Sequence, residues 1–240
     1  MLDFSQFEWL SFDCYGTLID WEAGILSYLQ PLLERKGRFA SDEEVLTLYS
    51  QLEPRNECPP YRTYREVLSA VVRDFGREHR FPVTPGDAAG LADSIAKWEP
   101  FPDTVPALQR LKSRYKLAIL SNIDDDLFAR SAPKLGVAFD CVVTSQKVRS
   151  YKPTVMNFQE LMRRLDFPRE RHLHVAESLY HDVAPARHLG IAAVWVNRRQ
   201  NKAASASKLA RVLPSLEVRD LQELADLAVP ASTGQAAATD

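Results

Sequence analysis

The sequence predicts an α/β fold in which a parallel sheet carries helices on both faces and a helical segment is inserted near the start of the chain. Two observations lead to this prediction. Beyond about residue 99, short apolar runs alternate with helix-like segments, whereas residues 22–98 show helix-like apolar spacing throughout. This alternation is typical of parallel strands, because each crossover between them usually contains a helix.

The strands of the sheet are predicted from short apolar runs. We expect strands at 7–12, 116–120, 141–144, 172–175 and 192–196, with a small one at 217–219. The segments between and after them predict helices at 105–113, 127–135, 156–165, 183–189 and 221–227. Helices between successive parallel strands would cover both faces of the sheet, which is a Rossmann-like arrangement.

The inserted segment carries four helix-like patterns. They lie at 23–36, 42–52, 61–79 and 84–98. Ser41, followed by three acidic residues, has the composition of a helix start, and Pro100 and Pro102 interrupt the helix that would return to the sheet. We therefore expect a core domain of residues 1–21 and 99–229, a helical cap domain of residues 22–98, and a flexible tail at 230–240.

The composition argues against nucleic acid and membranes as partners. The 240 residues are 45% hydrophobic and carry a formal net charge of −2, with the arginines dispersed. No basic tract would attract an anionic polymer, and no apolar run approaches membrane-spanning length. Cys14, Cys58 and Cys141 include no Cys-x-x-Cys pair, so the sequence predicts neither a zinc cluster nor a disulfide framework. We expect a cytoplasmic protein and leave homodimerisation open.

Asp13 is the first candidate for a catalytic residue. It follows the first predicted strand, and Gly16 permits a sharp turn that would leave its carboxylate at the carboxyl edge of the sheet, where open α/β sheets bind ligands. Asp13 would then be placed as a nucleophile. An ordinary Asp-Gly turn between a strand and a helix is the alternative. The neighbouring Cys14 should point away from the site into the packing, because side chains alternate along a strand.

Three later segments follow strands at comparable positions. They are Leu120-Ser121-Asn122, Tyr151-Lys152-Pro153, and the run from Val175 to Asp182 that contains Glu177. Together with the Asp-x-Tyr-Gly-Thr form at Asp13, they resemble the haloacid dehalogenase superfamily, and in particular its 2-haloacid dehalogenase branch. The resemblance spans about residues 8 to 220. It implies that the four segments meet in one active site.

Each segment has an expected role in that site. The Lys152 ammonium would keep the pKa of Asp13 low and help position the substrate, and Thr17 would orient Asp13 by a hydrogen bond unless it only caps the next helix. Ser121 and Asn122 would contact the substrate or the intermediate, as the resemblance implies. Asp124 and the two aspartates after it are expected to be a solvated helix start.

The fourth segment contains two carboxylates, and their spacing raises the question whether they bind a metal ion. By family position, Asp182 would orient or activate water, with Glu177 as a second candidate. Glu177 and Asp182 have the spacing of the family's phosphatase-like pattern, but Glu177 stands where that pattern has Asp. Because Mg²⁺ demands near-octahedral oxygen geometry, we predict no metal and no cofactor, and a phosphatase-like function would instead add Mg²⁺. His181 is as easily a packed histidine as a catalytic one.

Tyr15 decides between reaction types. Phosphatases of this superfamily usually carry an Asp two residues after the nucleophile, because a departing alkoxide needs a proton. A halide leaves without one. The sequence therefore predicts a hydrolase that displaces the leaving group from a small 2-substituted carboxylic acid through an ester on Asp13. The leading prediction is a 2-haloacid dehalogenase, which converts its substrate to a 2-hydroxy acid.

The resemblance is incomplete in the inserted segment. Dehalogenases of this branch place an arginine shortly before a Gln-Leu-Glu-like segment, whereas Ser50 precedes that segment here, and Arg55, Arg62 and Arg65 are the nearby candidates. This departure admits a related hydrolase that opens the ring of azetidine-2-carboxylate, with Tyr15 and Trp21 bordering a pocket for a cation. A magnesium-dependent phosphatase and a non-catalytic ligand-binding protein are the remaining alternatives.

Overall fold

The computed structural model describes residues 2–166, 168–199 and 212–230, and its centre is a parallel six-stranded sheet. The strands are β1 (Trp9–Phe12), β2 (Lys116–Ser121), β3 (Cys141–Thr144), β4 (His172–Ala176), β5 (Ala192–Val196) and β6 (Leu216–Val218). Their order is β3-β2-β1-β4-β5-β6. The predicted α/β fold class is therefore confirmed. β1 pairs with β2 on one side and β4 on the other, so the chain changes direction across the sheet at β1.

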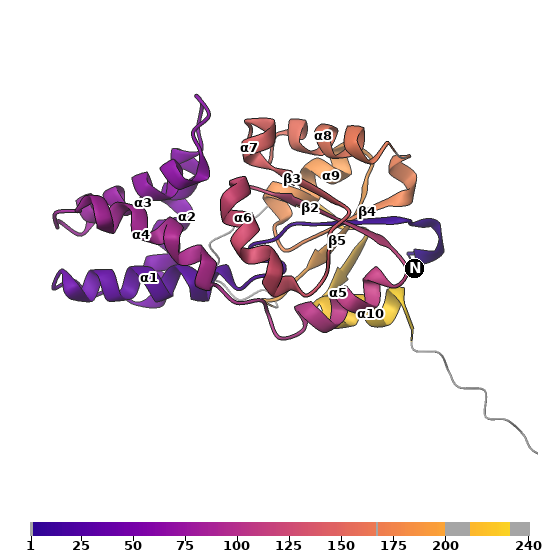
Figure 1. Cartoon of the computed structure of the whole chain (residues 1–240), viewed down its shortest axis with the longest axis horizontal. Coiled ribbons are helices and arrows are strands. Elements are labelled where there is room, and N and C mark those ends of the chain that lie inside the picture. The colour runs from indigo at the N-terminus through magenta and orange to yellow at the C-terminus, as the bar shows by residue number, and fades with distance from the viewer. Residues whose placement is uncertain (1, 167, 200–211, 231–240) are drawn as a thin grey trace, which may run out of the picture.

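Helices cover both faces of the sheet (Figure 1). Those of this layer are α5 (Thr104–Lys112), α6 (Asp125–Ser131), α7 (Ser145–Val148), α8 (Val155–Leu165), α9 (Ala184–His188) and α10 (Leu221–Ala228). Alternate residues of β2 show the two faces: Leu117 and Ile119 belong to the larger core with α5 and α10, while Ala118 and Leu120 pack with α8 and α9. This is the period of two expected of a strand buried on both sides.

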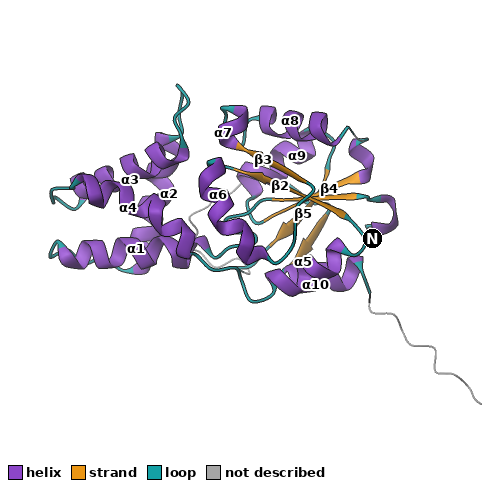
Figure 2. Ribbon diagram, viewed as in Figure 1, coloured by secondary structure: helices purple, strands orange, loops and turns teal. Residues whose placement is uncertain are grey.

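The inserted segment forms four helices beside the sheet. These are α1 (Trp21–Arg35), α2 (Asp42–Asn56), α3 (Tyr64–Glu78) and α4 (Pro85–Ser94), which Figure 2 shows as an all-helical group at the left. Three of them begin with reciprocal capping boxes, formed by Ser41 with Glu44, Thr63 with Glu66, and Thr84 with Asp87. Each box satisfies backbone donors of a first helical turn, so the sequence itself fixes where these helices start.

Some predicted bounds are wrong by a few residues, for local reasons. The helix predicted for 61–79 starts at Tyr64 because Thr63 is its cap, and the one predicted for 84–98 ends at Ser94, after which residues 95–97 form a 3₁₀ turn. The helix predicted for 183–189 is preceded by a single π-helical turn at 179–183. The predicted tail lies outside the described residues, apart from Pro230.

The two chain segments that join the insertion to the sheet lie side by side. Ile19 forms an isolated bridge with Pro100, and the Leu18 carbonyl accepts hydrogen bonds from Phe101 N at 3.1 Å and Thr104 Oγ1 at 2.8 Å. The predicted proline-rich return segment is therefore paired with the loop that follows Asp13. In the part of the chain that the structure describes, no helix is both long and apolar enough to span a membrane.

Candidate active site

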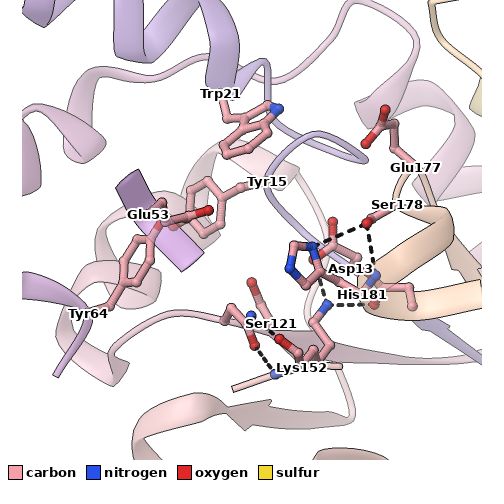
Figure 3. A pocket seen from close by; sticks show the side chains of 12 residues that line it. Asp13, Tyr15, Trp21, Glu53, Tyr64, Ser121, Lys152, Glu177, Ser178 and His181 are labelled. Carbon is pink, nitrogen blue, oxygen red and sulfur yellow. Dashed lines mark hydrogen bonds and ion pairs between the residues drawn. The ribbon is translucent and has the colours of Figure 1, made fainter. Parts of the chain in front are cut away.

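Asp13 lies at the carboxyl end of β1, in the middle of the sheet. Its backbone N–H donates to Val175 O at 3.1 Å, which continues the pairing with β4 by one residue. Gly16 then adopts a φ of 96°, and a Cβ at this position would lie 3.1 Å from Trp21 Nε1. A side chain at position 16 would therefore be both strained and crowded. The turn brings the Asp13 carboxylate into a pocket between the sheet and the insertion (Figure 3).

Both carboxylate oxygens of Asp13 accept a hydrogen bond. Lys152 Nζ lies 2.9 Å from Oδ1, and Thr17 Oγ1 donates to Oδ2 at 2.8 Å. The Thr17 hydroxyl in turn accepts from Glu177 N at 2.9 Å, which fixes its proton toward Asp13. Burial raises the pKa of Asp13, and Lys152 and Thr17 oppose that rise. Each oxygen retains a lone pair that could face a substrate.

Lys152 joins two carboxylates. Its ammonium donates to Asp13 Oδ1, to Leu120 O at 2.9 Å and to Asp182 Oδ1 at 2.6 Å, and the side chain is only 2% exposed. Burial works against the charge, but the two carboxylates outweigh it and raise the pKa of Lys152. All three ammonium protons are therefore used by the protein.

Asn122 holds the Lys152 loop. Its Oδ1 accepts from Lys152 N at 2.7 Å and its Nδ2 donates to Lys152 O at 3.1 Å. Asn122 also lines the pocket beside Ser121, as the sequence predicted. Both ends of its amide are thus bonded to the Lys152 backbone, and the expected contact of Asn122 with substrate stays a prediction.

Asp182 is brought to the site by the π-helical turn that follows β4. Ser178 caps this turn by accepting a hydrogen bond from His181 N at 3.0 Å. Asp182 is 1% exposed and also receives His174 Nε2 at 3.0 Å. Burial raises the pKa of Asp182, but the Lys152 ammonium and the bond from His174 outweigh it and lower that pKa overall. Unwound or over-wound helical turns of this kind are frequent at functional sites.

The other predicted residues line the same pocket. Tyr15 packs edge-on against Trp98, and its hydroxyl lies 2.9 Å from Ser131 Oγ. Trp21 packs edge-on against Tyr49, and Glu177 lies at the rim near Gly16. The structure thus gathers all the predicted site residues around Asp13, with Thr17 reaching it from behind and the others facing the cavity.

Glu53 is a pocket residue that the sequence analysis missed. It comes from α2, is 7% exposed, and accepts hydrogen bonds from Tyr64 at 2.6 Å and Tyr49 at 3.3 Å. Burial raises the pKa of Glu53, and the two tyrosine hydroxyls and Asp13 add smaller and opposed effects. In the sequence, the Gln-Leu-Glu segment was used only to locate the position where related dehalogenases have an arginine. Its glutamate was not considered as a pocket residue. Tyr64 and Ser178 also line the pocket and gave no signal.

The three arginines considered as substrate ligands lie elsewhere. Arg65 pairs with Asp93 and Asp126, Arg62 donates to Asn56, and Arg55 is exposed. None of the described residues around the pocket is an arginine. The ionisable side chains that line the pocket are therefore Lys152, His181 and four carboxylates. The carboxylates are those of Asp13, Glu53, Glu177 and Asp182.

The donor set does not fit a metal ion well. Within the described ranges, no group of three or more His, Cys, Asp and Glu side chains is arranged to hold one. Asp13 and Asp182 already share the Lys152 ammonium. A second cation between them would be repelled by the first.

Comparisons with known proteins agree with the fold. Residues 8–190 match the family model for haloacid dehalogenase-like hydrolases. An (S)-2-haloacid dehalogenase H-109 of Pseudomonas putida is 35% identical over 227 residues, covering 91% of this chain and 96% of that protein. A glyceraldehyde 3-phosphate phosphatase of Methanothermobacter thermautotrophicus is 32% identical over 146 residues, covering 60% of this chain and 64% of the relative.

Solved structures show the same architecture. The L-2-haloacid dehalogenase of Xanthobacter autotrophicus with chloropropionic acid covalently bound superposes with a TM-score of 0.73 at 20% identity, covering 92% of this chain and 98% of that one. The protein is thus a hydrolase with a Rossmann-like α/β fold, and its candidate site lies at the carboxyl edge of the parallel sheet. More particularly, the chain belongs to the haloacid dehalogenase-like hydrolase family.

Proposed function

We propose that this protein displaces the leaving group at C2 of a small 2-substituted carboxylic acid through an ester on Asp13, and that its principal reaction is 2-haloacid dehalogenation. The observation that carries this proposal is the way Asp13 is held. Lys152 and Thr17 each bind one oxygen of Asp13, and the carboxylate lines the pocket. The relationship to the (S)-2-haloacid dehalogenase of Pseudomonas putida supports the same substrate class.

The first step requires no acid. An Asp13 oxygen forms a bond to C2, the carbon–halogen bond breaks, and the halide takes the bonding electrons. Burial keeps the pKa of the Tyr15 phenol well above its usual range, so Tyr15 stays protonated and its hydroxyl remains with Ser131. A phosphatase would need a proton donor at this position for the leaving alkoxide, whereas the halide does not.

The second step hydrolyses the ester. Water attacks the carboxylate carbon of Asp13, the water oxygen stays on Asp13, and the original Asp13 oxygen leaves with the 2-hydroxy acid. Asp182 accepts the proton of that water in this proposal, with Glu177 at the rim as the alternative base. The low pKa of Asp182 ensures that it is ionised before the water arrives. The Lys152 ammonium stabilises negative charge on the carboxyl group throughout.

We also propose that residues 22–98 act as a cap that opens to admit substrate. The pocket has a free volume of only about 50 Å³ and is walled on the insertion side by Trp21, Glu53 and Tyr64. Opening of the insertion would widen the way in for a substrate, and closing it would exclude bulk water from the ester step. The paired segments at Ile19 and Pro100 are the natural hinge.

A single turnover in ¹⁸O-labelled water tests the covalent route. With enzyme in excess over 2-chloropropionate, we expect label in the peptide that contains Asp13 and unlabelled oxygen in the first lactate formed. Asp13→Asn should release no chloride. Label found only in the product, with none on Asp13, would contradict the proposal.

Glu53 supports a second candidate, the ring-opening hydrolysis of azetidine-2-carboxylate. A buried carboxylate in the pocket opposes a substrate anion and favours a cation such as a protonated ring nitrogen. The faces of Tyr15 and Trp21 would add cation–π attraction of about 0.5–2 kcal/mol. Like a halide, a protonated ring nitrogen leaves without a further acid.

Halide release and amine formation separate the two candidates. Chloride from 2-chloropropionate supports dehalogenation, and a primary amine from azetidine-2-carboxylate supports ring opening. Glu53→Gln should lower kcat/KM for the cationic substrate about tenfold or more and leave or improve that for the anionic one. Glu66→Gln, at an exposed capping position of α3, is the matched control and should change neither. An equal loss of kcat/KM for both substrates would show that Glu53 does not discriminate between substrates by their charge.

A magnesium-dependent phosphatase is the outcome that would overturn both. Because the carboxylates do not fit a metal, we expect full activity in EDTA. Phosphate release that depends on added Mg²⁺ would reverse this conclusion, and binding without turnover would point to the non-catalytic alternative. We further propose a cytoplasmic location, which the three free cysteines support, and homodimerisation stays a prediction.

A further inference from the structure

A buried chain of hydrogen bonds runs from Asp182 into strands β4 and β1. It takes no part in the proposed formation and hydrolysis of the ester. His174 Nε2 lies 3.0 Å from Asp182 Oδ1, and His174 Nδ1 lies 2.7 Å from Ser11 Oγ. Ser11 Oγ also lies 2.6 Å from His172 Nε2. These residues of β1 and β4 are at most 1% exposed. Two histidines completely removed from water beside a catalytic cluster call for a chemical explanation.

The directions of these hydrogen bonds follow from counting protons. Asp182 is ionised and can only accept, so His174 must carry its proton on Nε2. If His174 is neutral, its Nδ1 is an acceptor, and the single proton of Ser11 must point to it. Ser11 Oγ then accepts from Nε2 of His172. This leaves His172 Nδ1 unprotonated, and that buried nitrogen has no hydrogen-bond partner among the residues that the structure describes.

The unpartnered nitrogen supports this direction. A buried N–H without an acceptor costs more than a bare lone pair, so the orphaned atom should be the unprotonated one. Burial and the neighbouring His174 lower the pKa of His172 to about 3, so His172 is neutral and supplies one donor. The groups facing His174 are Asp182, Ser11 and the edge-on ring of Phe158, whose centroid lies 5.0 Å away. None of these contacts offers His174 Nδ1 another donor.

We propose that His174 is a positioning residue held in a single tautomer by Ser11 and His172, so that its Nε2–H always donates to Asp182. The donated bond fixes the rotamer of Asp182 and leaves its second oxygen for the hydrolytic water. Without Ser11, His174 could place its proton on Nδ1 and turn a lone pair toward Asp182, which would repel the carboxylate. The assignment of Asp182 as base rests on the proposed function, whereas the tautomer does not.

Nitrogen-15 NMR of histidine-labelled protein tests the tautomer directly, without substrate. We expect neutral Nε2–H rings for both His172 and His174 at neutral pH. A His174 ring protonated on Nδ1, or on both nitrogens, would overturn the proposal. His188, which is exposed, serves as the internal reference in the same spectrum.

A pair of variants tests the consequence for catalysis. Ser11→Ala should slow hydrolysis of the Asp13 ester about tenfold and leave ester formation nearly unchanged, so that mass spectrometry finds the ester accumulating. His174→Gln keeps a donor for Asp182 and an acceptor for Ser11, and an amide cannot change tautomer. Adding Ser11→Ala to His174→Gln should therefore have less than a twofold effect.

The two outcomes that would contradict the proposal differ from a failure of the proposed function. Equal slowing by Ser11→Ala in both backgrounds would show a packing role, and unchanged ester hydrolysis in Ser11→Ala would show no role. If no ester on Asp13 forms in any protein, including the unmodified one, the proposed function fails instead, and the NMR result still decides the tautomer.

Discussion

Lys152 is the residue on which the electrostatics of the site depend. It is 2% exposed and compensates Asp13 and Asp182, which are themselves buried. Taking these charges out of water is unfavourable, and the ammonium offsets the penalty only because all three of its protons are bonded. A change at this position therefore affects folding as well as chemistry.

Lys152→Met should abolish turnover and lower the free energy of unfolding by about 3–5 kcal/mol, because it leaves two carboxylates buried without a counter-ion. Chemical denaturation measures the stability and chloride release the activity. Lys97→Met, at an exposed position, should stay within about 0.5 kcal/mol. Similar stability of the two variants would show that Asp13 and Asp182 do not need the ammonium in order to fold.

Asp13 should give the acid limb of the pH profile. Burial raises its pKa above the ordinary value of 3.8, so protonation removes the nucleophile at a higher pH than for an exposed aspartate. We expect kcat/KM to fall as pH decreases through that raised value. The profile should be measured with a substrate whose own carboxyl pKa is known. An acid limb at or below 3.8 would show that Lys152 and Thr17 outweigh burial.

The sequence indicates residues well when they stand beside strands and less well elsewhere. Asp13, Lys152 and Asp182 follow apolar runs, and parallel strands bring such residues to one edge. Glu53 lies inside an amphipathic helix, where a carboxylate normally faces solvent. His174 lies within β4, where a histidine looks like part of the packing. Only the three-dimensional placement of α2 and the register of β1 with β4 reveal their partners.

At the scale of elements, capping and close packing decide how the insertion is built. Only the helix start at Ser41 was predicted from the sequence, whereas the structure shows three capping boxes, which account for the starts of α2, α3 and α4. The π-helical turn at 179–183 was not visible, because nothing in its composition separates it from the start of α9. Within this turn, Asp182 accepts a hydrogen bond from Lys152, which lies 30 residues earlier in the chain.

Two glycines of α4 give a matched test of packing. A Cβ at Gly90 would lie 2.3 Å from the Tyr28 hydroxyl oxygen, whereas at Gly86 the nearest atom would be 3.9 Å away. Gly90→Ala should therefore destabilise the protein by about 1–3 kcal/mol. Gly86→Ala should stabilise it by about 0.4–1 kcal/mol through the unfolded chain. Thermal unfolding compares the two, and equal shifts would mean that Tyr28 moves aside freely.

At the scale of the whole molecule, Asp124 joins the insertion to the sheet. It was predicted to be part of a solvated helix start, but it is 2% exposed, and its two oxygens accept from Tyr64 N and Arg65 N at 2.9 Å each. The carboxylate thus satisfies the first two backbone donors of α3, and Thr63 satisfies the third. The sequence could not show this, because the helix that Asp124 caps begins 60 residues earlier.

Asp124→Ala should loosen the closed arrangement of the insertion. We expect faster hydrogen exchange at the amides of Tyr64 and Arg65 and a higher KM, with a loss of about 0.5–2 kcal/mol for the missing cap. Asp126→Ala removes only an exposed partner of Arg65 and should change stability by less than about 1 kcal/mol. Unaltered exchange at Tyr64 and Arg65 in the Asp124 variant would argue against this role.

Because Asp124 caps α3, entry of water into the active site would be coupled to opening of the first turn of α3. In the proposed opening of the insertion, α3 would expose its first two amides and Asp124 its carboxylate, and water would have to solvate all three groups together. The rate of this opening would then limit how fast substrate enters and product leaves, even if the chemical steps at Asp13 were faster. Natural variation at position 124 should accordingly tune throughput while leaving selectivity untouched.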